Sequence, residues 1–392
     1  MVFIKFMLVG IDAHNLEGDR TGVGRYLFNL LKEWSKLKSG EWQMANGKFI
    51  LYFKDEVPAD MPKSDIFEFK LLSVSSTAKF THWDLPRSAK KDKVAILFCP
   101  AYIAPLWCQG KIALTLHDII YEAHPEWFNW PSPADKILLK WVSKKSARKA
   151  AIIFTPSEFS RQEVLSHYRV APDKVINIPL AADPELSRGF DNSAHKAEEI
   201  KALKISYGIR DKFIFFVGSI FSRRHLSEVI AAFSRLTKDA GGDNWQLLLS
   251  GADHTPGQAV SCLSKEINKR SGREAILQVD FSAGSELKLL YSACAFFIWL
   301  SDYEGFGLPV AEAMSVGVPV ITSDSTSLKE VAGGAALLIK DNFDVEKIYQ
   351  AMKQLASDEN LRQELIIKGR EQAAKFSWHQ CAEETLHALL HI

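Results

Sequence analysis

The chain has 392 residues, which is long for a single hydrophobic core, so two domains are expected. Its 48 Lys and Arg residues balance its 47 Asp and Glu residues, which argues against a nucleic-acid-binding protein. The five cysteines are odd in number and include no Cys-x-x-Cys pair, so a reduced cytoplasmic protein without structural zinc is predicted.

Apolar runs alternate with longer helical stretches along the chain, a pattern typical of α/β domains with parallel sheets. The first run, Met1 to Gly10, is too short to cross a bilayer and lacks a basic leader, so it predicts a strand around Phe6–Gly10. The other strands of the first half are expected around Ala95–Cys99, Ala113–Leu116 and Ala151–Thr155. Those of the second half are expected around Phe213–Val217, Gln246–Leu249, Phe296–Leu300 and Pro319–Thr322.

A polar stretch from Asp183 to Asp211 separates the two halves. It is rich in Glu, Lys, Ser and Asp and carries a short helical patch near Glu198–Leu203. We therefore place the hinge there. The amphipathic run from Asn360 to His391 predicts a long helical end of the chain.

A glycine-rich turn between a buried strand and a helix is the most informative segment. Glu304 and Glu312 bracket it with Glu-x7-Glu spacing, Gly305 and Gly307 permit close approach of a ligand, and Pro309 suits the first helical turn. The free amides of such a helix start attract anions. Carboxylates on both sides of an anion site favour a nucleoside diphosphate sugar, whose hydroxyls flank its phosphates. The alternative is an ordinary loop with two surface glutamates.

This turn resembles the E-x7-E signature of the family 4 retaining glycosyltransferases, and other segments resemble that family in the same order. They are Asp12 with Thr21–Tyr26, Thr115–Asp118 with His124–Trp127, Thr155–Ser160 with Ile178–Asp183, Phe216–Leu226, and Phe376–Trp378. The resemblance implies the GT-B fold, in which two Rossmann-like domains face each other across a cleft. Ligands of such sheets bind beyond the carboxyl ends of the strands, where these motifs fall.

The resemblance also assigns the domains. An acceptor-binding Rossmann-like domain is expected over residues 1–185 and a donor-binding domain for the nucleotide sugar over residues 205–372. The C-terminal helix, residues 373–392, is expected to cross back to the N-terminal domain.

The first turn of the second domain supplies candidate cations for a diphosphate. Gly218 and Ser219 end a buried strand, and Arg223 and Arg224 follow with guanidinium groups suited to bidentate phosphate contacts. By resemblance Arg224 stands where the family usually has lysine, and His225 where it often has asparagine. The charge is kept while the geometry of the contact changes. The alternative is a solvated arginine pair at the start of a surface helix.

The loop amides of Phe306, Gly307 and Leu308, together with the arginines, are expected to stabilise a leaving diphosphate. By family analogy Glu304 contacts hydroxyls of the donor sugar and Glu312 contacts the ribose, neither as a covalent nucleophile. The chain contains no Asp-x-Asp triplet, so we predict chemistry that requires no metal and no cofactor beyond the nucleotide-sugar co-substrate.

Candidate acceptor-side residues follow a strand of the first domain. His117 is expected to hydrogen-bond the donor sugar or to orient an attacking hydroxyl, with Asp118 polarising the site. The alternative is a turn with a helix cap. Tyr121 and Trp127 come soon after and form either a sugar-stacking wall or a packed loop.

A second glycine-containing loop lies near the N-terminus. Gly22 and Gly24 do not form a dinucleotide motif, because Leu27 stands where the third glycine should be. We expect the loop to reach towards the diphosphate, with Arg25 or Tyr26 buttressing it.

One helical stretch of the first half combines basic and apolar side chains, a pattern that can lie on an anionic membrane. Its basic residues are Lys136, Lys140, Lys144, Lys145, Arg148 and Lys149, and its apolar residues include Leu138, Leu139, Trp141 and Val142. The alternative is a solvated face whose apolar side packs on the core.

Within the family, the Thr-Leu-His-Asp and His-Pro-Glu-Trp-Phe stretches most resemble GDP-mannose-dependent mannosyltransferases of O-antigen assembly. The resemblance implies transfer of mannose to a glycan acceptor that is linked to a lipid, at the cytoplasmic face of the cell membrane. A transferase that uses a UDP sugar, and a GT-B protein that binds glycan or nucleotide without turnover, are the alternatives. The nucleotide base is expected to lie near Gly251–His254 and Val279–Ser282.

Overall fold

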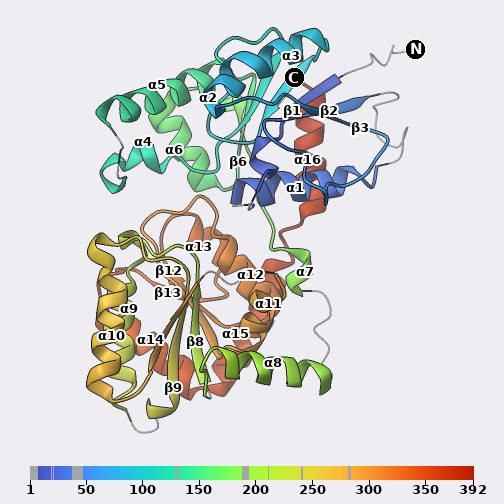
Figure 1. The fold of residues 1–392 in the computed structure, drawn as a ribbon. Helices are drawn as coiled ribbons and strands as arrows, with labels where there is room; N and C mark the ends of the chain where they lie inside the picture. Colours follow the sequence, from blue (N-terminus) through green and yellow to red (C-terminus); the bar gives the residue numbers. More distant parts are fainter. Residues whose placement is uncertain are drawn as a thin grey trace. The chain divides into compact units, whose positions relative to one another are not determined.

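The computed structural model describes residues 8–18, 20, 22–37, 47–128, 130, 132–187, 194–210, 212–239, 242–280 and 284–392. The chain forms two compact units, of which unit 1 runs to Leu180 and resumes at Ser377–Ile392, while unit 2 is Ala181–Phe376. Each unit is built on a parallel sheet flanked by helices (Figure 1).

Unit 1 contains a seven-stranded sheet in the order β3-β2-β1-β4-β5-β6-β7. The strands are β1 Leu8–Asp12, β2 Lys48–Phe53, β3 Phe67–Leu71, β4 Ile96–Cys99, β5 Lys111–Thr115, β6 Ile152–Thr155 and β7 Val175–Asn177. The α-helices are α1 Gly22–Trp34, α2 Thr77–Lys79, α3 Leu85–Lys91, α4 Ile120–Ala123, α5 Pro133–Lys149, α6 Glu158–Tyr168 and α16 Trp378–Leu390. The short turns are η1 His14–Leu16, η2 Phe80–Asp84, η3 Pro125–Trp127 and η4 Pro172–Lys174.

Unit 2 contains a six-stranded sheet in the order β10-β9-β8-β11-β12-β13. The strands are β8 Lys212–Val217, β9 Trp245–Ser250, β10 Ile276–Val279, β11 Phe296–Trp299, β12 Val320–Ser323 and β13 Leu337–Ile339. The α-helices are α7 Pro184–Ser187, α8 Ala194–Ser206, α9 Leu226–Leu236, α10 Ala259–Ser271, α11 Gly284–Ala293, α12 Leu308–Val316, α13 Thr326–Ala332, α14 Val345–Ser357 and α15 Glu359–Ala373. The 3-10 turns are η5 Ser222–Arg224, η6 Gly242–Asn244 and η7 Pro256–Gln258.

The two Rossmann-like sheets confirm the predicted fold class. In each sheet the chain order reverses beside the first strand, because β1 lies between β2 and β4, and β8 lies between β9 and β11. Loops diverge at such a reversal, and ligands of open α/β sheets bind there. The loops that follow β8 and β11 are therefore neighbours at the carboxyl edge of the unit 2 sheet.

The end of the chain returns to unit 1, as predicted. The terminal helical run is two helices, because α15 ends at Ala373 and α16 begins after Ser377, whose hydroxyl accepts from the Gln380 amide at 3.4 Å. In unit 1, α16 packs on α1, and the Trp34 indole donates to the Ala382 carbonyl at 2.9 Å. That buried hydrogen bond fixes the register of the last helix on its own unit.

Candidate active site

The turn that follows β8 brings the backbone close to a tryptophan. β8 is buried from Phe213 onward and is followed by Gly218, which has a φ of 133°. A Cβ atom at Gly218 would lie 2.9 Å from the Trp299 ring and 3.1 Å from Arg224 Nη1, so only glycine fits. Ser219 is exposed at this turn. The sequence therefore uses glycine here to pack the turn tightly beneath the arginines.

Arg224 is the central cation of the site. It is 8% exposed, its Nη2 lies 3.3 Å from Glu304 Oε1, and its Cζ lies 3.9 Å from the centre of the Trp299 ring. Burial lowers the pKa of the guanidinium to about 10, despite the opposing attraction of Glu304, so the group stays charged at neutral pH. Both Nε and Nη1 of Arg224 are buried, and neither has a hydrogen-bond partner among the residues that the structure describes. Buried N–H groups of this kind are costly unless a ligand supplies acceptors.

Arg223 lies beside Arg224 and is half-buried. Its guanidinium stacks over the Phe221 ring at 4.5 Å, and its Nε is also buried without a hydrogen-bond partner. The turn from Gly218 to Arg224, called the arginine turn below, therefore presents two adjacent cations with unused N–H donors. A diphosphate requires such a set of donors.

The Glu304 loop connects β11 to α12 and is held from three sides. Ser327 Oγ donates to the Glu304 carbonyl at 2.8 Å, and the Phe306 ring packs edge-on against Phe376 at 5.4 Å. Gly307 has a φ of 98°, and a Cβ atom there would lie 2.6 Å from Leu328. Gly305 and Phe306 are buried, and Leu308 opens the helix. The loop thus holds Glu304 next to Arg224, and α12 begins four residues after Glu304.

Glu312 lies in α12, eight residues after Glu304. It is 2% exposed and accepts from the Tyr291 hydroxyl of α11 at 3.3 Å. Carboxylate oxygens held in this way are fixed acceptors. The structure therefore joins Glu304 to the arginine turn, and Glu312 to α11.

His117 follows β5 in unit 1 and is 9% exposed. Its Nε2–H donates to the Pro100 carbonyl at 3.1 Å, and the edge of the Tyr26 ring lies 4.8 Å away. Burial lowers the pKa of the imidazole to about 4, so the ring is neutral at physiological pH and Nδ1 carries a lone pair. Such a ring accepts a hydrogen bond well but is a weak general base.

Two neighbours of His117 make local contacts. Asp118 Oδ1 accepts from the Ile120 amide at 3.1 Å, so this carboxylate shapes the start of α4. Trp127 is 38% exposed and stacks on His124 with ring centres 3.9 Å apart. Trp127 therefore keeps one face available, whereas Asp118 serves the turn at least in part.

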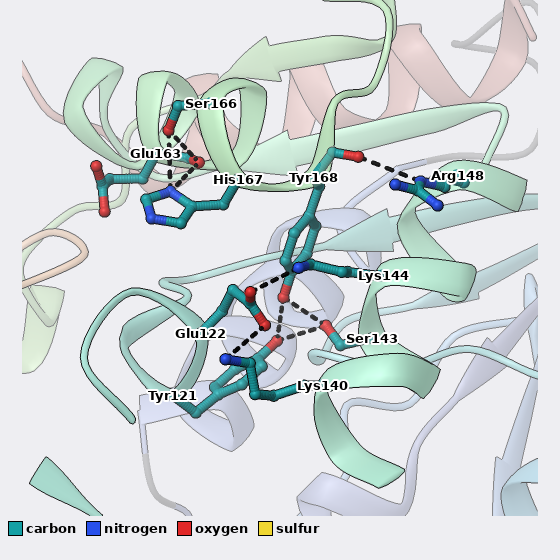
Figure 2. A network of polar contacts seen from close by, with 10 residues as sticks. All are labelled: Tyr121, Glu122, Lys140, Ser143, Lys144, Arg148, Glu163, Ser166, His167 and Tyr168. Carbon is teal, nitrogen blue, oxygen red and sulfur yellow. Dashed lines mark hydrogen bonds and ion pairs between the residues drawn. The ribbon is translucent and has the colours of Figure 1, made fainter. Parts of the chain in front are cut away.

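Tyr121 does not form a surface for sugars. It is 4% exposed, and its hydroxyl lies 2.5 Å from Ser143 Oγ and 2.9 Å from the Tyr168 hydroxyl (Figure 2). The three hydroxyl groups join α4, α5 and α6 inside unit 1. Of the two alternatives for Tyr121, a sugar-stacking wall or a packed loop, the structure supports the packed loop, because the ring is buried and its hydroxyl is engaged inside unit 1.

The predicted basic face of α5 is partly neutralised. The Glu122 carboxylate lies 2.6 Å from Lys144 Nζ and 3.5 Å from Lys140 Nζ (Figure 2). Arg148 Nε donates to the Tyr168 carbonyl at 3.3 Å, and Lys149 Nζ donates to the Leu106 carbonyl at 2.5 Å. These contacts tie the helix to its own unit.

The N-terminal glycines lie in the first turn of α1. A Cβ atom at Gly24 would lie 2.4 Å from the Asn15 carbonyl, whereas Gly22 has open space around it. Tyr26 is 2% exposed, and its hydroxyl lies 3.3 Å from Thr115 Oγ1 at the end of β5. Arg25 is half-buried in the same turn. Tyr26 therefore buttresses the His117 segment.

The loops expected near the base are described in part. Gly251 has a φ of 145°, and a Cβ atom there would lie 2.2 Å from the Gly218 carbonyl. The His254 ring stacks on Phe221 with centres 5.1 Å apart. Phe281 and Ser282, like Thr21, Phe6 and Met7 in unit 1, lie outside the described residues. Within the described ranges, no group of three His, Cys, Asp or Glu side chains could hold a metal ion.

Comparison with known families decides the identity. The family model described as "Glycosyltransferase Family 4" matches residues 54–186, and the one described as "Glycosyl transferases group 1" matches residues 200–372. The chain is a family 4 glycosyltransferase. The two matches fall on unit 1 and unit 2 in succession, so the arginine turn and the Glu304 loop both lie in the group 1 region.

Relatives of this glycosyltransferase support the assignment. O-antigen chain mannosyltransferase B of Escherichia coli is 27% identical over 383 residues, which cover 94% of this chain and 95% of that protein. The serotype-specific mannosyltransferase WbdA of Escherichia coli is 32% identical over 234 residues, or 60% of this chain, and the match spans 28% of that longer protein.

Solved structures show the same fold. WaaG, a glycosyltransferase involved in lipopolysaccharide biosynthesis, has a TM-score of 0.73 at 13% identity and covers 98% of this chain and 99% of its own. Anabaena HepE in complex with UDP-glucose has a TM-score of 0.70 at 16% identity and covers 98% of this chain and 100% of its own. No helix in the described part of the glycosyltransferase is long and apolar enough to span a bilayer.

Trp299, His225 and Asn342 were not predicted as site residues. Trp299 ends an apolar run that reads as ordinary core, yet its ring lies against Arg224. Asn342 joins the site from a loop distant in sequence, through a hydrogen bond to Asp302 at 2.9 Å. The only sequence signal was the position of His225 directly after the arginine pair.

Proposed function

We propose that this glycosyltransferase transfers mannose from GDP-mannose to a lipid-linked glycan acceptor, with retention of the anomeric configuration and without a metal ion. The observation that carries the proposal is Arg224, a buried cation held 3.3 Å from Glu304, whose Nε and Nη1 have no hydrogen-bond partner among the described residues. The names of the Escherichia coli relatives, an O-antigen chain mannosyltransferase and a serotype-specific mannosyltransferase, favour mannose as the sugar.

The charges of the site suit departure of a nucleoside diphosphate. Cleavage of the glycosyl phosphate bond places negative charge on the leaving diphosphate and positive charge on the anomeric carbon. Arg223 and Arg224, with the amino end of α12, meet the negative charge in a site of low dielectric constant, where preorganised donors act most strongly. Glu304, beside them, offers its carboxylate to hydroxyls of the sugar.

The proposed retention rests on the protonation states. Glu304 is engaged with Arg224, which opposes a role as a free nucleophile. His117, with a pKa of about 4, is a weak base for the acceptor hydroxyl. We therefore assign the acceptor proton to an oxygen of the leaving phosphate, with attack on the same face of the sugar.

Metal independence follows from the donors that the chain does supply. The sequence has no Asp-x-Asp triplet, and two arginines provide the positive charge that a divalent cation would otherwise bring. Tyr291 holds Glu312 as an acceptor, and we assign this carboxylate to the ribose hydroxyls.

The experiment that tests the donor combines binding with turnover. Thermal shift is measured with GDP, UDP and ADP and with their mannose and glucose conjugates, since a ligand that binds the native state raises its stability by mass action. GDP-mannose is expected to give the largest shift and to support transfer to lipid-linked glycan. Stabilisation by UDP sugars instead would overturn the GDP-mannose assignment. Binding without transfer or hydrolysis would favour a non-catalytic protein.

We propose further that α5 binds unit 1 to the cytoplasmic surface of an anionic membrane. Ile137, Leu138 and Trp141 are 70%, 59% and 50% exposed on α5, and Lys145 lies 5.9 Å from the Trp141 ring. Because the Glu122 carboxylate pairs with Lys140 and Lys144 and offsets one of their two positive charges, the remaining face is more apolar than the basic composition alone indicates. Apolar side chains flanked by lysine suit the headgroup region.

Flotation with vesicles tests the membrane contact. Wild-type protein is expected to float with phosphatidylglycerol vesicles, and the triple variant I137S/L138S/W141S is expected to stay in the bottom fraction. Ile205→Ser is the matched control, because this isoleucine is 71% exposed on α8 in unit 2. Equal flotation of the triple variant and the wild type would refute α5 as the contact.

A further inference from the structure

His225 occupies an unusual backbone conformation directly after the arginine turn. It has φ 51° and ψ 33°, in the left-handed region, between η5 and α9. A positive φ is uncommon for any residue other than glycine, although histidine, like asparagine and aspartate, adopts it more often than most residues do. The side chain is nevertheless 2% exposed, so the ring is buried and must have a partner to be retained there.

The partner is Asp302, from the loop that follows β11. His225 Nε2 lies 2.7 Å from Asp302 Oδ2, a close polar contact whose angles are not those of a hydrogen bond, and Nδ1 lies 3.7 Å from Glu228 Oε2. The edge of the Phe343 ring covers the imidazole, with ring centres 4.5 Å apart. The contact joins two loops that follow neighbouring strands.

Asp302 continues the connection in two directions. Its backbone N–H donates to the Arg223 carbonyl at 3.0 Å, and its Oδ1 accepts from Asn342 Nδ2 at 2.9 Å. Asn342 Oδ1 in turn accepts from Ser323 Oγ at 2.8 Å, and the Ser301 amide donates to that same hydroxyl at 2.9 Å. One chain of hydrogen bonds therefore crosses the loops after β8, β11, β12 and β13.

His225 and Asp302 each lie close in sequence to a residue that we assign to the donor site. His225 follows Arg224 directly, and Asp302 precedes Glu304 by two residues. We infer that the His225–Asp302 contact is a brace that holds the arginine turn against the Glu304 loop, and that His225 is a positioning residue for diphosphate binding. The inference rests on the proposed function of Arg224 and Glu304.

The physical advantage is preorganisation. Two loops that are free to separate would have to be ordered by the nucleotide sugar, and that cost would be subtracted from binding. A brace formed during folding removes this cost, and a guanidinium held in place needs no rearrangement when the diphosphate leaves. The brace touches neither phosphate nor sugar, so its effect passes through Arg224 and Glu304.

The alternative is that His225 only shapes the start of α9, where its carbonyl accepts from the Val229 amide at 3.0 Å. Substitution by glycine separates the two roles. His225→Gly keeps the left-handed backbone and removes the ring, whereas His225→Asn keeps the backbone and retains a short amide donor. Arg169→Gly is the matched control, because Arg169 has φ 52° at the end of α6 in unit 1.

The experiment measures the dissociation constant of GDP, with UDP in parallel, by calorimetry, together with the unfolding temperature of each variant without ligand. We expect His225→Gly and Asp302→Ala each to weaken nucleotide binding about tenfold, as loss of a supporting outer contact commonly does. The double variant is expected to bind no more weakly than Asp302→Ala, because that single variant already removes the His225–Asp302 contact together with the Asn342 hydrogen bond. His225→Asn is expected to recover most of the affinity, and Arg169→Gly to leave it unchanged.

Three results separate failure of the His225–Asp302 brace from failure of the proposed function of Arg224 and Glu304. A lower unfolding temperature of His225→Gly with unchanged nucleotide affinity would overturn the brace and leave a purely structural histidine. Additive losses in the double variant would also overturn it. Failure of the wild type to bind any nucleoside diphosphate, or unchanged binding by Arg224→Met, would overturn the proposed function and the brace together.

Discussion

Replacement of Arg224 by methionine tests the site most directly. Methionine keeps much of the side-chain volume over Trp299 and removes the charge and all five N–H donors. The guanidinium is 8% exposed and its pKa is lowered to about 10, which means that burial already disfavours its charged form. We therefore expect the unfolding temperature without ligand to change little.

The loss of binding is expected to be large. Nε and Nη1 are the Arg224 nitrogens without partners in the described part of the chain, so a diphosphate that accepts once from each of them would form two charge-assisted hydrogen bonds there. Each such bond contributes ~1.5–3 kcal/mol, so the variant should lose ~3–6 kcal/mol of interaction with the diphosphate. At 1.36 kcal/mol per factor of ten, that energy corresponds to a loss of ~10²–10⁴ in kcat/KM for the nucleotide sugar.

The assay is steady-state transfer from labelled GDP-mannose, with calorimetry of GDP binding beside it. Arg235→Met is the matched control, because Arg235 is an exposed arginine of unit 2 whose Nη1 pairs with Glu346 at 2.6 Å. Surface pairs of this kind contribute little. A value of kcat/KM for Arg224→Met within threefold of the wild type would refute the assignment of this cation to the diphosphate.

Three further predictions follow from the same geometry. Glu304→Gln is expected to lower kcat by roughly 10–100-fold with a modest change in KM, whereas Glu312→Gln is expected mainly to raise KM for the nucleotide sugar. Equal rates for both variants and the wild type would contradict these roles. Activity is expected to persist in excess EDTA, and complete loss that only manganese or magnesium restores would contradict metal independence. Burial lowers the pKa of His117 from 6.5 to about 4, so between these pH values the unfolded chain binds a proton at His117 that the folded chain does not. The free energy of unfolding should therefore fall as pH drops through that window, by up to about 1.4 kcal/mol per pH unit. His117→Gln should flatten this pH dependence, measured by urea unfolding.

The central strands of both sheets were predictable from sequence, and the peripheral ones less so. Runs such as Phe213–Val217 are apolar throughout because helices cover both faces of a parallel strand. β7 and β13 have three residues each, too few to show any period. β3 lies at the sheet edge with Phe69 and Leu71 exposed, which blurs its pattern. β2, by contrast, carries a clear apolar run, but it was not among the predicted strands.

The site was predictable where function depends on local sequence and obscure where it depends on packing. The arginine turn and the Glu304 loop each carry glycines and charges at short spacing, and the family resemblance indicated that they meet. The burial of Tyr121 depends on hydroxyl groups of Ser143 and Tyr168, which come from other helices. No local pattern encodes such a contact, because it forms only when α4, α5 and α6 pack together.

Arg224, which by resemblance stands where the family usually has lysine, fits the way this site is built. A flat guanidinium can stack on the Trp299 ring, here at 3.9 Å, while its edge carries donors towards a ligand. An ammonium group offers no plane to stack and loses its charge more readily when buried. Arg224→Lys is therefore expected to lose about tenfold in nucleotide affinity although it conserves charge, and a combined Arg224→Lys and Trp299→Leu variant should lose little more, because the indole supports binding only through the guanidinium. A large further loss in the combined variant would show that Trp299 acts on the ligand itself.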